Sequence, residues 1–237
     1  MTGTPELVQS THPGRVRRIH LALVLLSFSA GAADAFAFLA LGGIFTANMT
    51  GNLILSGMFT RPQFALTLLT AGVAIVSFVG VLYTAFRLTR APTTVSATAR
   101  RAFGRLVLPS AAVQTVVVVI WMVLPGAEST VERCVVIALS AAALALQTVA
   151  AKKLSDVDGV TTTYVTGTLT TTMQDLALRT AHGQGVRVLS VLALPVGAVC
   201  ATAALALAPI LGPVVAWVAA LLATGLLIPG PGSDFGE

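Results

Sequence analysis

The sequence predicts an all-α, polytopic membrane protein with six transmembrane helices, arranged as two inverted three-helix repeats. Three observations support this prediction. The 237 residues are 56% hydrophobic and only 10% charged, whereas a soluble domain has about 25% charged residues. The apolar residues form long runs of about 20 residues, enough to cross the hydrocarbon core of a bilayer. The basic residues lie at the ends of these runs, where membrane topology uses them.

Six full-length apolar runs follow one another along the chain, and each is expected to cross the membrane. Two shorter segments, 44–59 and 160–178, directly follow a span, contain glycine and are rich in threonine or asparagine. Whether they also cross decides the topology. The predicted spans cover residues 20–43, 63–86, 104–125, 131–151, 186–208 and 210–229.

The lysine and arginine residues distinguish six crossings from eight. With six spans and the N-terminus inside, 12 of the 14 basic residues face the cytoplasm, and only Arg61 and Arg133 face outward. Eight spans would place seven on each side. Because cytoplasmic loops carry an excess of lysine and arginine, the sequence predicts six spans and two re-entrant or broken short segments. We therefore expect a multi-pass protein of the bacterial inner (plasma) membrane, with both termini cytoplasmic.

The two short segments resemble each other. Residues 46–53 and 162–169 both fit the pattern T-x-x-x-T-G-x-L, 116 positions apart (46 and 162). Each follows the first span of a three-span group, and the two groups start on opposite sides, so the repeats would be inverted. The predicted organisation is a cytoplasmic tail (1–19), a first membrane repeat (20–125), a second, inverted repeat (126–229) and a C-terminal tail (230–237).

Inverted repeats with interrupted helices are typical of secondary transporters, which bind solutes near the bilayer midplane. A glycine in each segment would relax the backbone there, and the freed polar groups would need protein, water or ligand. In the alternative interpretation, the threonines bond to carbonyls of their own helix and the small residues only allow close packing. The predicted solute-binding residues are Asp34, Asn48, Thr50, Gly51, Asn52, Gln147, Thr162, Thr166 and Gly167.

Asp34 is the only charged residue between Leu21 and Phe59. A carboxylate in the middle of a span costs about 3 kcal/mol on insertion scales, which makes it a functional-site hypothesis. Two interpretations stay open: Asp34 couples transport to a proton or ion, or it caps the backbone amides of the interrupted segment. Gln147 is its candidate counterpart in the second repeat. Gln114 in the third span predicts a further polar contact.

Two stretches of sequence carry a family resemblance. Gly-Ala-Ala-Asp-Ala at 31–35 and Phe-Thr-Ala-Asn-Met-Thr-Gly-Asn-Leu at 45–53 resemble the signature of the YoaK-type bacterial membrane proteins. Ala-Leu-Gln at 145–147 and the segment 162–169 resemble that family's second motif. The resemblance covers nearly the whole chain between the tails. It implies the membrane architecture but little mechanism, because the family is catalogued as a domain of unknown function.

These features favour a small secondary transporter or facilitator for a small polar or charged solute. An oligomeric channel and a non-transporting structural or accessory membrane subunit are the alternatives. An enzyme is not expected, because the three histidines lie near span ends or in a tail and no nucleophile or metal motif appears. The expected partners are the lipid bilayer, the solute and, in a homo-oligomer, further copies of the chain.

The net charge of +5 comes from residues at the ends of apolar runs, so no nucleic acid partner is expected. We expect no metal and no cofactor either. Residues 87–105 hold five arginines around a linker rich in threonine, serine and alanine. The orientation signal explains this cluster, and binding of anionic lipid headgroups is the alternative.

Overall fold

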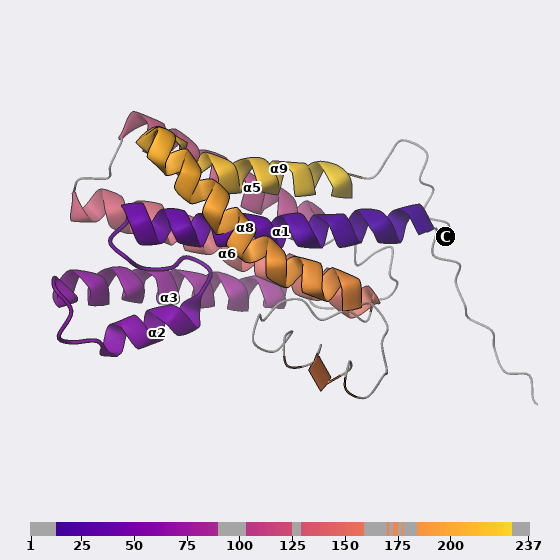
Figure 1. Ribbon diagram of the computed structural model, residues 1–237, viewed down its shortest axis with the longest axis horizontal. Coiled ribbons are helices and arrows are strands. Elements are labelled where there is room, and N and C mark those ends of the chain that lie inside the picture. The colour runs from indigo at the N-terminus through magenta and orange to yellow at the C-terminus, as the bar shows by residue number, and fades with distance from the viewer. Residues whose placement is uncertain are drawn as a thin grey trace, which may run out of the picture.

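Six long apolar helices form the bundle, as the sequence predicts (Figure 1). The computed structural model describes residues 13–89, 103–124, 129–158 and 184–228, and positions 170, 173, 174 and 177. In these residues, the helices long and apolar enough to span a membrane are Val16–Ala40, Phe64–Leu88, Gly104–Val123, Thr130–Leu154, Gly185–Leu207 and Pro209–Leu227.

The first helix begins earlier than the sequence predicts. α1 starts at Pro13, so the last part of the predicted tail 1–19 is helical. Proline fits the first turn of a helix, where its missing N–H has no intrahelical partner. The elements are α1 (Pro13–Ala40), α2 (Met49–Gly57), α3 (Phe64–Leu88), η1 (Phe103–Val107), α5 (Leu108–Val123), α6 (Thr130–Asp158), α8 (Gln184–Leu207), η2 (Pro209–Leu211) and α9 (Val214–Leu227).

The first short segment re-enters the bundle and does not cross it. After α1 ends, the chain turns back toward the middle of the bundle, and α2 then runs to the end where α3 begins (Figure 1). α2 has nine residues and is therefore about 14 Å long, roughly half of the hydrocarbon thickness. Most of the second short segment, 160–178, lies outside the described residues.

The chain reverses at a pair of glycines upstream of the motif. Gly42 and Gly43 have φ values of 99° and 76°, which side chains other than glycine rarely adopt. The carbonyl of Gly43 accepts a hydrogen bond from Arg61 Nη1 at 3.2 Å, and the Arg133 side chain lies beside Gly42. The expectation that Gly51 relaxes the backbone was therefore wrong, because Gly51 lies inside the helical α2.

Two central helices organise the bundle. α1 packs against α8 and α9, whereas α6 packs against α3 and α5; α1 also touches α6, and α5 touches α9. The approach of α1 to α8 is close, because Gly31 lies on the backbone of Leu194 and Gly197 lies on the carbonyl of Phe28. Small residues let membrane helices pack this closely.

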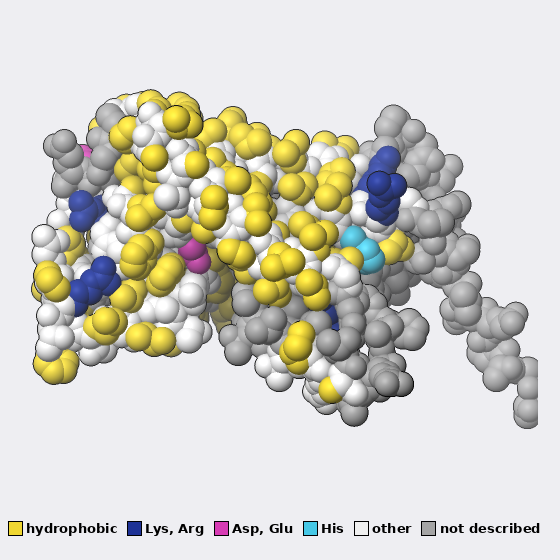
Figure 2. All heavy atoms as spheres, viewed as in Figure 1, with side chains coloured by type: hydrophobic (Ala, Val, Ile, Leu, Met, Phe, Trp, Pro, Cys, Tyr) yellow, Lys and Arg dark blue, Asp and Glu magenta, His cyan; other side chains and the backbone are white. Residues whose placement is uncertain are grey.

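The surface is apolar around the middle of the bundle and basic at its ends (Figure 2). Large side chains that would be buried in a soluble protein are open here; Val76 is 73% exposed and Val199 is 68% exposed. We call the end where α1 starts and α3 stops the basic end. The basic residues whose side chains are described there are Arg17, Arg18, Arg87, Arg105, Lys152, Lys153 and Arg187, while Arg61 and Arg133 lie at the opposite end.

Candidate functional site

Asp34 of α1 holds the backbone that leads into α2. Its Oδ1 accepts hydrogen bonds from the N–H groups of Thr46 and Ala47, both at 2.7 Å, and from the Thr46 hydroxyl at 3.4 Å. These amides come just before the first turn of α2, where the helix dipole favours a negative charge. These contacts are the ones expected if Asp34 caps the backbone amides of the interrupted segment. Proton or ion coupling through the half-buried Asp34 stays a prediction.

Asn52 joins α2 to the same connection. Its side chain is fully buried. Its Oδ1 accepts from the N–H of Phe45 at 2.9 Å, and its Nδ2 donates to the carbonyl of Phe45 at 2.7 Å. Both backbone groups of Phe45 are thereby paired where regular secondary structure cannot pair them. The Asn52 amide, which the sequence predicts to bind solute, is thus hydrogen-bonded to the protein's own backbone.

The remaining predicted residues of the first motif lie along α2. Asn48 is the N-cap, and its Oδ1 accepts from the N–H of Gly51 at 3.0 Å. The side chain of Thr50 is exposed. A Cβ atom on Gly51 would lie 2.7 Å from the ring of Phe45. Gly51 therefore provides space for this ring, which is the packing role that the sequence left as an alternative.

Gln147 of α6 is buried and has no hydrogen-bond partner among the described residues. Its side chain is only 4% exposed, and neither Oε1 nor Nε2 has a partner in the described part of the chain. An unpaired buried polar group lowers the stability of the folded protein by about 1–3 kcal/mol. A polar partner that hydrogen-bonds to this amide would therefore be favourable. Its predicted neighbours Thr162, Thr166 and Gly167 lie outside the described residues.

A small cavity, here called the central cavity, lies between α1, α5, α6 and α9. Its volume is about 20 Å³, which is room for about one water molecule. Gln114 is 6% exposed, and its Oε1 has no hydrogen-bond partner within the described ranges. Ser140 adds a second polar side chain to a wall that is otherwise apolar. The lining residues are Ala33, Phe36, Gln114, Val117, Ser140, Leu144, Pro213 and Ala216.

Contacts between helices hold the walls of the central cavity in place. The rings of Phe36 and Trp121 meet edge to face, with centroids 4.8 Å apart. The Ser29 hydroxyl donates to the carbonyl of Ala216 at 2.9 Å and links α1 to α9. In the same way, Ser110 of α5 donates to the carbonyl of Ala143 of α6 at 2.9 Å.

The sequence singled out Gln114 as a polar contact but did not predict Ser140. A glutamine stands out in a run of valines, which is a usable signal. A serine in a membrane helix usually bonds to its own backbone or to a neighbouring helix. Only the packing of four helices shows that Ser140 lines the central cavity.

A family model described as "Protein of unknown function (DUF1275)" matches residues 22–228. The chain belongs to this family. It is also similar to the UPF0700 transmembrane protein YoaK of Bacillus subtilis (strain 168), with 30% identity over 158 residues, 66% of this chain and 67% of that protein. No solved structure matches the chain. The YoaK-type resemblance is thus confirmed, and so is a multi-pass membrane protein.

The DUF1275 match runs from α1 to the end of α9. It therefore includes both polar regions of the bundle: the Asp34–Asn52 network and the central cavity. The family's description names no activity, so a functional interpretation has to come from the geometry of these regions.

Proposed function

We propose that this DUF1275 protein is a small secondary transporter or facilitator for a small polar or charged solute. The central cavity carries the proposal, because it is lined by Gln114, whose buried Oε1 has no hydrogen-bond partner among the described residues, in the middle of an apolar bundle. Polar groups at this depth are costly and typically mark the pathways of solutes or ions. A solute or water in the cavity would provide the missing hydrogen bond.

We further propose that the two halves are inverted repeats. The repeat relation would exchange α1 with α6, α3 with α8 and α5 with α9. Under this exchange, the contacting pairs α1–α8 and α1–α9 become α6–α3 and α6–α5, and these pairs are also in contact. The members of each exchanged pair run in opposite directions (Figure 1). The central cavity is lined by α1, α6, α5 and α9, so it lies where the axis of such an exchange would pass. This arrangement suits alternating access around a fixed site.

The orientation follows from charge. We place the chain in the bacterial inner membrane with its basic end and both termini in the cytoplasm, in accordance with the positive-inside rule. Alkaline phosphatase fused at Thr60, in the turn between α2 and α3, should be active, whereas the same enzyme fused to the C-terminus should be inactive. The reverse pattern would overturn the orientation.

Flux measurements test the transport proposal. Purified protein in liposomes should accelerate the uptake of at least one member of a panel of ions and small polar solutes. Gln114→Leu should abolish this uptake and leave the protein folded. Thr202→Val is the matched control, because Thr202 is exposed and the described hydrogen bond of its hydroxyl goes to its own helix, at the carbonyl of Ala198.

Three outcomes would count against the proposal. Absence of flux across the panel by folded protein would favour a structural or accessory subunit. Conductance steps far above the turnover of a carrier would indicate an oligomeric channel. Unchanged flux in Gln114→Leu would remove the central cavity from the pathway.

Coupling at Asp34 is a separable part of the proposal. Asp34→Asn keeps an oxygen that can accept from Thr46 and Ala47 but removes the titrating group. If Asp34 couples transport to protons, a pH gradient should no longer drive uptake by this variant, while uptake down the solute's own gradient persists. Equal responses of the variant and the wild type to the pH gradient would exclude coupling through this residue.

A further inference from the structure

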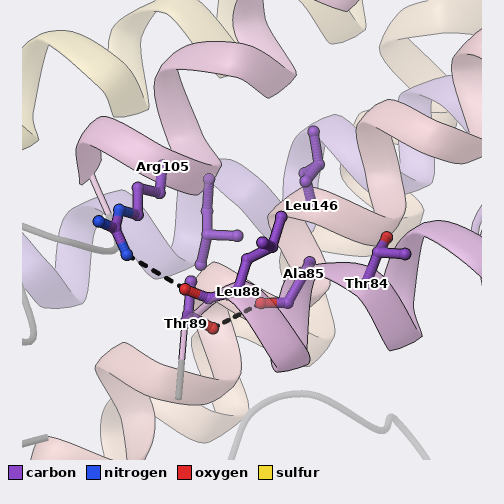
Figure 3. Close-up of a pocket in the computed structure, with 7 residues that line it drawn as sticks. Thr84, Ala85, Leu88, Thr89, Arg105 and Leu146 are labelled. Atoms are coloured by element: carbon purple, nitrogen blue, oxygen red, sulfur yellow. Dashed lines mark hydrogen bonds between the residues drawn. The ribbon is translucent and has the colours of Figure 1, made fainter. Parts of the chain in front are cut away.

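A second, larger pocket opens at the basic end, between the end of α3, the η1 turn and α6 (Figure 3). Its volume is about 400 Å³, about twenty times that of the central cavity by the same measure. One part of the wall is apolar and another part carries a guanidinium. The lining residues are Thr84, Ala85, Leu88, Thr89, Arg105, Leu106 and Leu146.

The basic groups at this pocket contact only uncharged acceptors in their described hydrogen bonds. Arg105 Nη1 donates to the carbonyl of Leu88 at 3.1 Å, as Figure 3 shows. Lys153 Nζ donates to the carbonyl of Thr89 at 3.1 Å. These carbonyls end α3, so the two cations also lie at the negative end of its dipole. A carbonyl pairs a donor but does not neutralise its charge, and the exposed guanidinium keeps further N–H groups for an anion.

The pocket lies at the ends of apolar spans, where the boundary between lipid and water is expected. Leu88 is the last residue of α3, and Arg105 is in the first turn of the spanning segment Gly104–Val123. Phosphates of the bilayer lie at this level, and acyl chains begin just below it. Leu88 is 72% exposed, so an apolar surface adjoins the charged one.

We propose that this pocket binds an anionic phospholipid. Its phosphate contacts Arg105, Lys153 strengthens the positive field, and its acyl chain lies along Leu88, Leu106 and Leu146. Charge complementarity selects an anionic headgroup, since basic pockets between membrane helices bind such lipids. The apolar wall selects a lipid over a free phosphate ion. The proposal does not depend on transport.

Lipid retention by the purified full-length protein tests the proposal. Native mass spectrometry should show preferential retention of phosphatidylglycerol over phosphatidylcholine with the same acyl chains. Arg105→Gln should reduce this preference about fivefold, the effect of one basic residue at a membrane surface. Arg17→Gln is the matched control: it removes one charge from the same end, on α1, and should leave the preference unchanged.

A second variant tests the apolar wall without touching the charges. Thr84→Phe places a ring in the pocket and should reduce the retention of both lipids. If Arg105→Gln fails to fold, Thr84→Phe still tests whether a lipid occupies the pocket. Three outcomes would overturn the proposal: equal losses in the Arg105 and Arg17 variants, full phosphatidylglycerol retention in Thr84→Phe, or displacement of the lipid by millimolar inorganic phosphate.

Discussion

Two polar regions lie inside the same apolar bundle and differ in how their hydrogen bonds are satisfied. Around the connection from α1 to α2, Asp34 and Asn52 both bind backbone groups of residues 45–47. At the central cavity, Gln114 Oε1 has no hydrogen-bond partner in the part of the chain that the structure describes. A polar residue in a membrane span therefore does not by itself indicate a binding site. Its hydrogen-bond partners distinguish a structural role from a candidate binding role.

The difference has a physical cause. Irregular backbone at membrane depth exposes N–H and C=O groups that lipid cannot pair, and the connection into α2 pairs them with Asp34 and Asn52. Gln114 lies on a regular helix, whose backbone already pairs itself. Its amide oxygen therefore does not pair backbone groups and remains available to water or a solute. Variants of both regions sharpen this comparison.

Asn52→Leu should have the largest effect. It leaves the N–H and the carbonyl of Phe45 without their described partner, at about 1–3 kcal/mol for each group. We expect a loss of about 3 kcal/mol in the free energy of unfolding, measured in mixed micelles by SDS titration with tryptophan fluorescence. A loss no greater than that of Thr202→Val would show that the connection does not depend on Asn52.

Asp34→Asn should cost less, about 1–2 kcal/mol. The amide oxygen still accepts from Thr46 and Ala47, but the bonds lose the contribution of the charge. The same SDS titration measures this effect. If Asp34→Asn and the wild type are equally stable, the capping contacts are dispensable and the coupling interpretation of Asp34 gains weight.

Asn48→Ala should cost about 1 kcal/mol, the usual effect of losing an N-cap acceptor. Asn48→Asp should restore this stability, because aspartate also accepts from the N–H of Gly51. Loss of flux in a stable Asn48→Asp variant would instead assign the amide a role in solute binding, as the sequence predicts.

Gln114→Leu should change stability least, by less than about 1 kcal/mol, and the change is expected to be a gain. Replacing an unpaired buried polar group by an apolar one of similar shape is nearly neutral or stabilising. Gln147→Leu should behave in the same way, because neither polar atom of its amide has a described partner. A marked loss of stability in either variant would show that the glutamine has a partner within the folded protein.

Hydrophobic length alone was enough to predict the spans. The predicted spans 63–86 and 186–208 correspond to helices Phe64–Leu88 and Gly185–Leu207, with ends within two residues. The re-entrant first segment also followed from counting basic residues. The sequence did not predict the chain reversal at Gly42 and Gly43. A Thr-Gly motif and a Gly-Gly pair both indicate a flexible backbone. Only the backbone angles show that the chain reverses at Gly42 and Gly43.

The sequence by itself determined a six-span helical membrane protein, because bilayer thickness and charge asymmetry act on each segment locally. Tertiary structure decided which polar residues are satisfied. Asp34 meets amides 12 and 13 residues away, and Ser29 meets a carbonyl 187 residues away. The central cavity needs four helices from both halves of the chain. Such contacts depend on how helices pack in three dimensions, which no local pattern of residues records.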